Sequence, residues 1–228
     1  KYAIWAQYRA HPRWEYVNWS EIWVMEVSTG KTKRITSKTR YLNPVLFNSS
    51  NILAIELNTK GISRIVQLDL AGNKISEMKL PYGIEPKEIA VNNNGGIALR
   101  VVSKKGASII YYEKFNGPRK VILPNNFRQI SNLVFVGNQL LFRMSENFKN
   151  NIFCLKIGTG EIIEIFNSTI SVDYFSYYND HEIIISTNNV FGTSPYTYKL
   201  PSSQNARLSF IKWERGLFNE NFHSKITT

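Results

Sequence analysis

The sequence predicts an all-β repeat protein, because two different turn signals recur along the chain with the same spacing. The first signal is a short polar turn around a glycine, and the four glycines are 42, 45 and 43 residues apart. The second is a turn rich in Asn, Asp or Gly before an aliphatic residue, and these aliphatic residues are 45, 43 and 43 apart. The positions are Gly30, Gly72, Gly117 and Gly160 for the first signal, and Ile52, Ile97, Leu140 and Ile183 for the second. A period of about 40 to 45 residues that holds four short strands is typical of one blade of a β-propeller.

Apolar residues between the turn signals alternate or cluster as they do in strands. The expected strands are 44–47, 52–57, 63–68 and 74–79 in a second blade; 87–91, 97–102, 107–112 and 120–123 in a third; 133–136, 139–144, 151–156 and 161–166 in a fourth; and 174–177, 182–186, 194–199 and 206–212 in a fifth. The propeller segment then covers 1–215, with blades at about 1–38, 39–81, 82–125, 126–168 and 169–214, followed by a polar tail or linker at 216–228.

The first of these five recognisable blades is incomplete. Its strands at 4–8, 21–27 and 32–35 correspond to the second, third and fourth strands of a blade, with no first strand before them. Either the C-terminal tail supplies that strand and closes the ring, or this chain is a segment of a longer polypeptide. Residues 219–228 are too polar for an inner strand, so we expect a segment of a larger protein.

The formal net charge is +11, from 28 basic and 17 acidic residues, which raises the question of a nucleic-acid partner. One local cluster consists of Lys31, Lys33, Arg34, Lys38 and Arg40. The other basic residues are spread over all blades, which favours a solvated basic surface over a dedicated nucleic-acid groove. An acidic protein, an anionic glycan or a lipid headgroup would also suit a surface with this positive potential. The apolar runs have strand length, so we expect no transmembrane helix.

The sequence predicts no catalytic residue, no cofactor and no metal site. It lacks the Gly-x-Ser-x-Gly elbow, the phosphate-binding loop, the dinucleotide fingerprint and the His-Glu-x-x-His motif. The three histidines, His11, His181 and His223, are far apart, and His181 is expected in a turn before a strand. The single cysteine, Cys154, lies among apolar residues and is expected to be a small buried side chain in a strand.

A long insertion between the second and third strands of the first blade is the main departure from the repeat. It covers 9–20, where the other blades need only a few residues, and it is rich in the side chains that dominate protein interfaces. In propellers such loops emerge beside the blade-to-blade connections, which places the insertion near Tyr41. The candidate partner-binding residues are Arg9, His11, Arg13, Trp14, Tyr16, Trp19 and Tyr41. The alternative is that Trp14 and Trp19 fold back and cover the open edge of the blade.

The segment 21–36, followed by 41–47, resembles the repeat of TolB-type propellers. In that family a strand of the form Ile-Tyr-Val-Met-Asp-Leu precedes Thr-Gly, a basic pair and Leu-Thr, as Thr29-Gly30, Lys33-Arg34 and Ile35-Thr36 do here. A new blade then opens with a proline, an aromatic residue and a Ser-Pro-Asp-Gly hairpin. Here Pro44 and Phe47 are present, but 48–51 reads Asn-Ser-Ser-Asn.

The wider pattern over about 2–200 includes Tyr8-Arg9 before the insertion, Arg13-Trp14, the segment 20–23, and 150–153 before a Thr-Gly turn. This pattern is more similar to propellers of large bacterial envelope proteins, some of which follow a gluzincin-type peptidase domain. Such propellers serve as interaction platforms or restrict access to a peptidase. The resemblance therefore implies a non-catalytic propeller in the cell envelope that binds a protein or polymer through loops on one face. Two alternatives stay open, namely an accessory propeller of a larger peptidase or hydrolase and a non-specific binder of anionic polymers.

Overall fold

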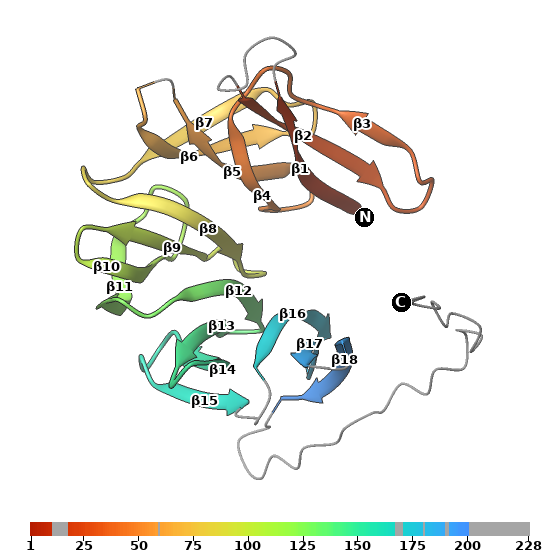
Figure 1. The fold of residues 1–228 in the computed structure, drawn as a ribbon. Coiled ribbons are helices and arrows are strands. Elements are labelled where there is room, and N and C mark those ends of the chain that lie inside the picture. The colour runs from red at the N-terminus through yellow and green to blue at the C-terminus, as the bar shows by residue number, and fades with distance from the viewer. Residues whose placement is uncertain (11–17, 59, 167–170, 180, 190–191, 201–228) are drawn as a thin grey trace, which may run out of the picture.

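The computed structural model describes residues 1–10, 18–58, 60–166, 171–179, 181–189 and 192–200. Their strands form five antiparallel sheets that follow one another along an open arc (Figure 1). Each sheet keeps its strands in chain order from the inside of the arc outward, as in the blades of a propeller. The prediction of an all-β, five-bladed propeller with an incomplete first blade is confirmed. Within the described ranges no helix is long and apolar enough to cross a membrane.

The first and last blades have three described strands each, and the other three blades have four. The first blade contains β1 (Tyr2–Ala10), β2 (Asn18–Glu26) and β3 (Thr32–Arg34). The second contains β4 (Tyr41–Leu46), β5 (Asn51–Leu57), β6 (Ser63–Asp69) and β7 (Lys74–Lys79). The third contains β8 (Glu85–Val91), β9 (Ile97–Ser103), β10 (Gly106–Tyr112) and β11 (Arg119–Asn126). The fourth contains β12 (Ile130–Val136), β13 (Gln139–Glu146), β14 (Lys149–Lys156) and β15 (Ile162–Phe166), and the fifth contains β16 (Val172–Asn179), β17 (Glu182–Asn189) and β18 (Gly192–Lys199). The strand expected at 206–212 lies outside the described residues.

The first strand of each complete blade begins two to three residues earlier than the sequence predicts. The cause is a bulge that interrupts the pairing of these strands, for example between Leu42 and Val45 in β4. Asn43 in β4 and Asn132 in β12 occupy the bulges with φ angles of 47° and 58°. Asparagine tolerates this left-handed conformation, so a residue type that is typical of turns lies inside a strand.

The apolar core lies between neighbouring blades. One cluster joins Ile22 of the first blade to Ile52 and Val66 of the second, and three further clusters join the second to the third, the third to the fourth and the fourth to the fifth. A fully buried aliphatic side chain contributes about 1.5–3 kcal/mol, so each blade depends on its neighbours. Cys154 is buried in the last cluster, as predicted, and burial raises the pKa of its thiol to about 11.

Polar side chains on the inner strands connect successive blades. The bulge in β12 leaves the backbone N–H groups of Asn132 and Leu133 without a partner on β13, and the carboxylate of Glu88 in β8 accepts both, at 3.0 and 2.8 Å. The side-chain oxygen of Asn132 accepts the N–H of Phe175 in β16 at 2.8 Å. The side-chain amide of Asn43, in contrast, donates to the backbone carbonyl of Lys87. Because buried backbone donors need acceptors, these bonds set the spacing of the inner strands.

Candidate binding face

The connections between strands emerge at two opposite ends of the blades, because antiparallel strands reverse direction at each turn. Connections between the second and third strands of a blade share one end with the connections between blades. We call this end the loop face; it comprises 35–40, 60–62, 80–84, 104–105, 127–129 and 147–148, together with the ends of β1 and β2 that flank 11–17. We call the opposite end the turn face; it comprises 27–31, 47–50, 70–73, 92–96, 113–118, 137–138 and 157–161.

Side chains of the turn face satisfy the backbone of their own turns. The Oδ1 atom of Asp69 accepts the N–H groups two and four residues further on, both at 2.8 Å. The Oδ1 atom of Asn92 accepts the equivalent groups at 3.0 and 2.7 Å, and that of Asn48 accepts groups two and three residues further on at 2.9 and 2.8 Å. Local hydrogen bonds of this kind stabilise tight turns.

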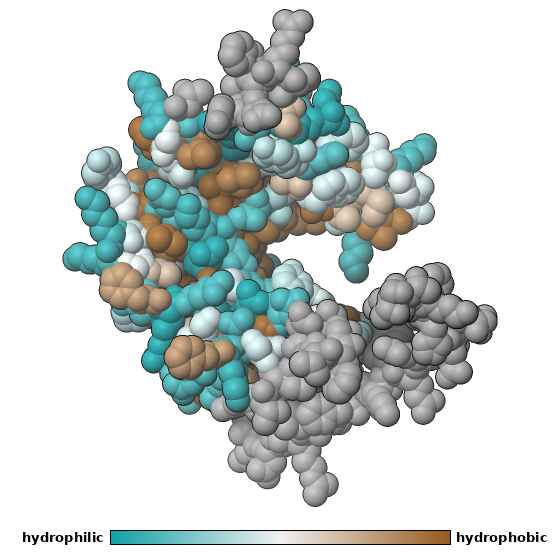
Figure 2. Space-filling model, viewed as in Figure 1, coloured by the Kyte–Doolittle hydropathy of each residue, from teal (hydrophilic) through white to brown (hydrophobic). Residues whose placement is uncertain are grey.

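The three most exposed aromatic side chains of the described residues all lie on the loop face. Tyr82 and Phe148 are fully exposed, and Phe127 is 88% exposed. Phe148 also has a φ of 63°, which costs a non-glycine residue about 1–2 kcal/mol. In the space-filling view, hydrophobic side chains interrupt a largely hydrophilic surface (Figure 2). The loop face thus exposes an aromatic ring at Phe148 even though the backbone conformation there disfavours a residue with a side chain.

Lysines accompany these rings on the loop face. Lys38, Lys60, Lys104, Lys105 and Lys149 are exposed, and none of them forms an ion pair with another described residue. Exposed rings next to positive charges that have no partner are suited to contact with an acidic surface.

Glu21 holds the base of the insertion together. Its side chain is only 3% exposed, and its carboxylate accepts Arg9 at 3.0 Å, Arg34 at 3.3 Å and the N–H of Lys38 at 3.1 Å. These partners come from the end of β1, from β3 and from the connection to the second blade. Burial opposes ionisation of Glu21, but the Lys38 N–H, Arg34 and Arg9 outweigh it and hold its pKa below the ordinary value.

The connection at 35–40 is also tied to the start of β2. The hydroxyl of Thr36 accepts the N–H of Ile22 at 2.8 Å, and Thr39 donates its hydroxyl to the carbonyl of Ser20 at 2.9 Å. The strand that follows the insertion is therefore fixed to the first blade-to-blade connection. This geometry agrees with the expectation that the insertion emerges close to such a connection.

The structure describes three of the seven candidate residues from the sequence. Arg9 is exposed and pairs with Glu21, Trp19 is half-buried at the start of β2, and both lie at the loop face. Tyr41 is only 8% exposed because its ring packs into the core between the first and second blades, so it offers little surface to a partner. The other four candidates, His11, Arg13, Trp14 and Tyr16, lie outside the described residues.

The basic cluster noted in the sequence is divided between different roles. Arg34 is paired with Glu21, and Arg40 donates from Nε to the carbonyl of Asn18 at 3.3 Å. Lys31 and Lys33 lie at and next to the turn after β2, towards the turn face, whereas Lys38 lies on the loop face. The cluster therefore does not form one continuous patch.

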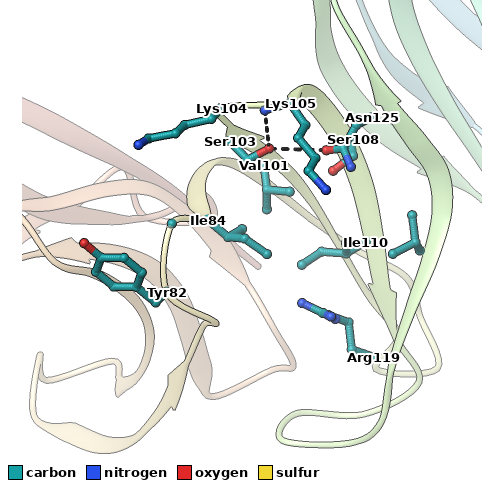
Figure 3. A pocket seen from close by; sticks show the side chains of 12 residues that line it. Tyr82, Ile84, Val101, Ser103, Lys104, Lys105, Ser108, Ile110, Arg119 and Asn125 are labelled. Atoms are coloured by element: carbon teal, nitrogen blue, oxygen red, sulfur yellow. Dashed lines mark hydrogen bonds between the residues drawn. The ribbon is translucent and has the colours of Figure 1, made fainter.

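A pocket of about 440 Å³ opens between the second and third blades, where the connection at 80–84 faces β9, β10 and β11 (Figure 3). Its lining consists of Tyr82, Gly83, Ile84, Val101, Ser103, Lys104, Lys105, Ser108, Ile110, Arg119, Val121 and Asn125. The lining is mainly apolar, contains three basic side chains and contains no acidic side chain.

Sequence reasoning missed this pocket and the three exposed aromatic residues. The available signal was an aromatic residue within a predicted turn, as in Pro81-Tyr82-Gly83 and Asn147-Phe148. The pocket gave no such signal, since its residues come from three strands of the third blade and from the connection before it, and only folding brings them together. The described residues contain no cluster of three or more His, Cys, Asp or Glu side chains that could hold a metal ion. His181 lies in the turn before β17, as expected.

No protein family and no curated protein matches the sequence. Among solved structures, the chain resembles TolB from Acinetobacter baumannii, with a TM-score of 0.66 and 11% identity over 85% of this chain and 49% of that one. It also resembles putative TolB from Agrobacterium tumefaciens, with a TM-score of 0.65 and 12% identity over 83% of this chain and 69% of that one. A third similar structure is the acylaminoacyl peptidase of Pyrococcus horikoshii, with a TM-score of 0.57 and 12% identity over 81% of this chain and 35% of that one.

The chain thus spans about half the length of the Acinetobacter TolB and about a third of the peptidase. At these identities the likeness shows the fold, which is that of TolB-like and peptidase-associated propellers. Activity, partners and localisation do not follow from a shared fold.

Proposed function

We propose that this propeller is a non-catalytic interaction module that binds a protein or another polymer through its loop face. The observation that carries the proposal is the difference between the two faces. The exposed rings of Tyr82, Phe127 and Phe148 lie on the loop face, whereas the two aromatic residues among the described turn-face residues, Phe47 and Phe115, are half-buried. Aromatic rings are the side chains most often found at the energetic centre of interfaces.

The insertion belongs to the same proposed surface. Arg9 and Trp19 stand at its two ends on the loop face, and Glu21 joins Arg9 to Arg34 and to the N–H of Lys38. We keep His11, Arg13, Trp14 and Tyr16 as proposed contacts because their residue types are common in interfaces. The fold likeness to TolB supports placing the module in a bacterial cell-envelope protein.

A second candidate is an accessory propeller of a larger peptidase. The fold likeness to the Pyrococcus horikoshii acylaminoacyl peptidase, of which this chain covers 35%, favours it. Cleavage of unstructured peptides by the parent polypeptide, but not by this segment alone, would support the second candidate. If the parent polypeptide had no such activity, the interaction module would be favoured over the accessory propeller.

A third candidate is a non-specific binder of anionic polymers, which the net charge of +11 supports. Its affinity for heparin or DNA would fall steeply with salt and would not depend on sequence. Binding carried by aromatic contacts would instead retain much of its strength at high salt, because apolar burial is not screened by ions.

The test of the first proposal is to replace aromatic side chains of the loop face. A partner captured from an envelope extract is identified and purified. It is then titrated against the unsubstituted chain and against the variant F127S/F148S. Because the two rings are fully or almost fully exposed, the variant should fold normally and bind about tenfold or more weakly. The variants R13A and W14A test the insertion in the same titration.

The matched control is V27S/I75S, which removes two apolar side chains that are 51% and 53% exposed at or next to the turn face. It should leave the affinity unchanged. Equal loss of affinity in the control and the loop-face variant, or no loss in either, would show that the loop face is not the binding surface.

A further inference from the structure

We infer that the pocket between the second and third blades binds an apolar side chain of an extended, acidic peptide segment. The inference rests on the proposed function, because it names the chemistry of the partner and the point on the loop face that recognises it.

The floor of the pocket is made of aliphatic side chains of the third blade and of the connection that precedes it. Ile84 comes from the connection between the blades, Val101 and Ile110 come from β9 and β10, and Val121 comes from the outer strand β11. Val121 is 51% exposed although it borders this apolar floor. An apolar group that entered the pocket would therefore remove aliphatic surface from water, which is favourable in proportion to the area buried.

Positive charges converge on this floor from two directions. Figure 3 shows Lys105 and Arg119 pointing toward the space beside Ile84 and Ile110, the former from the turn between β9 and β10 and the latter from β11. Lys104 points outward from the same turn. None of the three forms an ion pair with a described residue.

The absence of acidic side chains from the lining distinguishes this site from the paired basic side chains on β6, β7 and β9. Arg64 and Lys74 on the second blade share the carboxylates of Glu56 and Glu77, and Arg100 on β9 itself is paired with Glu88. The pocket cations have no such partner in the lining. A carboxylate supplied from outside would gain charge-assisted hydrogen bonds, and the fork of Arg119 suits a bidentate contact.

The place of the pocket favours a peptide as the occupant. It opens where the connection at 80–84 and the turn at 104–105 meet, and both belong to the loop face. Tyr82 stands fully exposed at its margin. A chain that crosses the loop face can insert one apolar side chain and place carboxylates on either side of it. A protein partner bound by the loop face would provide such a segment.

The test uses the full chain and three short fluorescent peptides. The first is Asp-Glu-Leu-Leu-Asp-Glu, the second replaces its acidic residues with Asn and Gln, and the third replaces both leucines with serine. Fluorescence anisotropy gives the affinity of each peptide. We expect the first peptide to bind about tenfold or more tightly than either control, because each control removes one of the two kinds of contact.

Two pocket variants and one matched control locate the site. R119Q and K105Q each remove one charge from an exposed side chain without an ion pair, so both should fold normally and lower the affinity for the first peptide about tenfold. K120Q changes the exposed residue between Arg119 and Val121 that is not part of the lining, and it should leave the affinity unchanged. V121D puts a carboxylate at the apolar edge and should abolish binding.

The outcomes separate this inference from the proposed function. Binding of the first peptide that is lost in R119Q and K105Q and kept in K120Q supports the pocket. No binding, equal binding of all three peptides, or equal losses in K120Q and R119Q would overturn the inference. If F127S/F148S weakens a partner while the pocket variants do not, the loop face stands and the pocket inference fails. If the peptide binds the pocket but loop-face variants leave every partner unaffected, the pocket stands and the proposed function fails.

Discussion

The two faces of this propeller differ in the aromatic rings that they expose. On the turn face, Asn48, Asp69 and Asn92 direct their side chains back onto their own turns. On the loop face, Asn58 caps its own turn in the same way, but the Asn147-Phe148 hairpin, with φ angles of 49° and 63°, directs an aromatic ring into solvent. Turns that only reverse the chain can be optimised for stability. Loops that carry surface chemistry keep conformations that stability alone would not select.

The comparison predicts that changes on the turn face alter stability and leave binding intact, whereas most changes on the loop face do the opposite. Three substitutions test this contrast through their effects on stability.

The largest loss of stability is expected for G72A on the turn face. Gly72 has a φ of 92°, and a Cβ atom there would lie 1.9 Å from the carbonyl oxygen of Ile35 in the neighbouring blade. The backbone of one blade or the other must move, so the free energy of unfolding should fall by about 4 kcal/mol. Chemical denaturation of the two proteins measures the difference.

The matched control for that change is G160A. Gly160 occupies the equivalent turn of the fourth blade with a φ of 74°, but no atom lies within 4 Å of the added Cβ. It should cost only the left-handed conformation, about 1–2 kcal/mol. Equal losses of unfolding free energy in G72A and G160A would mean that the close approach to Ile35 does not contribute to the destabilisation.

An intermediate effect is expected for E21Q, which is the exception on the loop face. Removing the charge leaves Arg9 and Arg34 without their carboxylate. Because both arginine side chains are nearly half exposed, we expect the free energy of unfolding to fall by about 2 kcal/mol, which is less than for a fully buried pair. Since the Glu21 pKa lies below its ordinary value of 4.5 in the folded protein, this stabilisation is complete above pH 4.5 and is lost as the pH falls through the lowered pKa.

Denaturation of the parent and E21Q proteins over a range of acidic pH values measures this dependence. The difference between them should be constant near neutral pH and should shrink below pH 4.5. A difference that grows as the pH falls would contradict the assignment of Glu21 as an ionised anchor. Weaker partner binding by E21Q would also indicate that the ion pairs of Glu21 are needed for the insertion to bind its partner.

The smallest effect, and the one with the opposite sign, is expected for F148N. Asparagine accepts the φ of 63° more readily than phenylalanine, so the substitution should stabilise the protein by about 0.5–1 kcal/mol. If Phe148 belongs to the binding surface, the same variant should bind its partner more weakly. F148N that is less stable than the parent would show that the ring makes a stabilising contact.

Much of the fold could be predicted because the repeat is encoded locally. Gly30, Gly72 and Gly160 all have positive φ angles, as turns at a fixed position of each blade require. In the third blade the left-handed residue is Asn116, with a φ of 60°, rather than the neighbouring Gly117 that marks the period in the sequence. The left-handed residue thus lies one position before the glycine used to find the repeat. The turn was still found at this place because asparagine and glycine both permit a left-handed conformation.

The candidate site was predicted less well, because it depends on contacts between blades. Tyr41 was expected on the surface because it opens a blade, but its ring faces the core formed with Ile22 and Ile52. The insertion was found because its length breaks the period. The pocket was not found, because Ile84 and Val121 are 37 positions apart in the sequence and only packing brings them together.

The sequence by itself determined the all-β repeat, the number of recognisable blades and the incomplete first blade. Those features follow from turn residues and apolar periodicity that act over a few neighbouring positions. Tertiary structure decided which of the exposed-looking residues are buried, which charges are paired and where a pocket opens. Burial and pairing depend on the approach of one blade to the next, and residues about one repeat apart, such as Glu88 and Asn132, meet only when the blades pack.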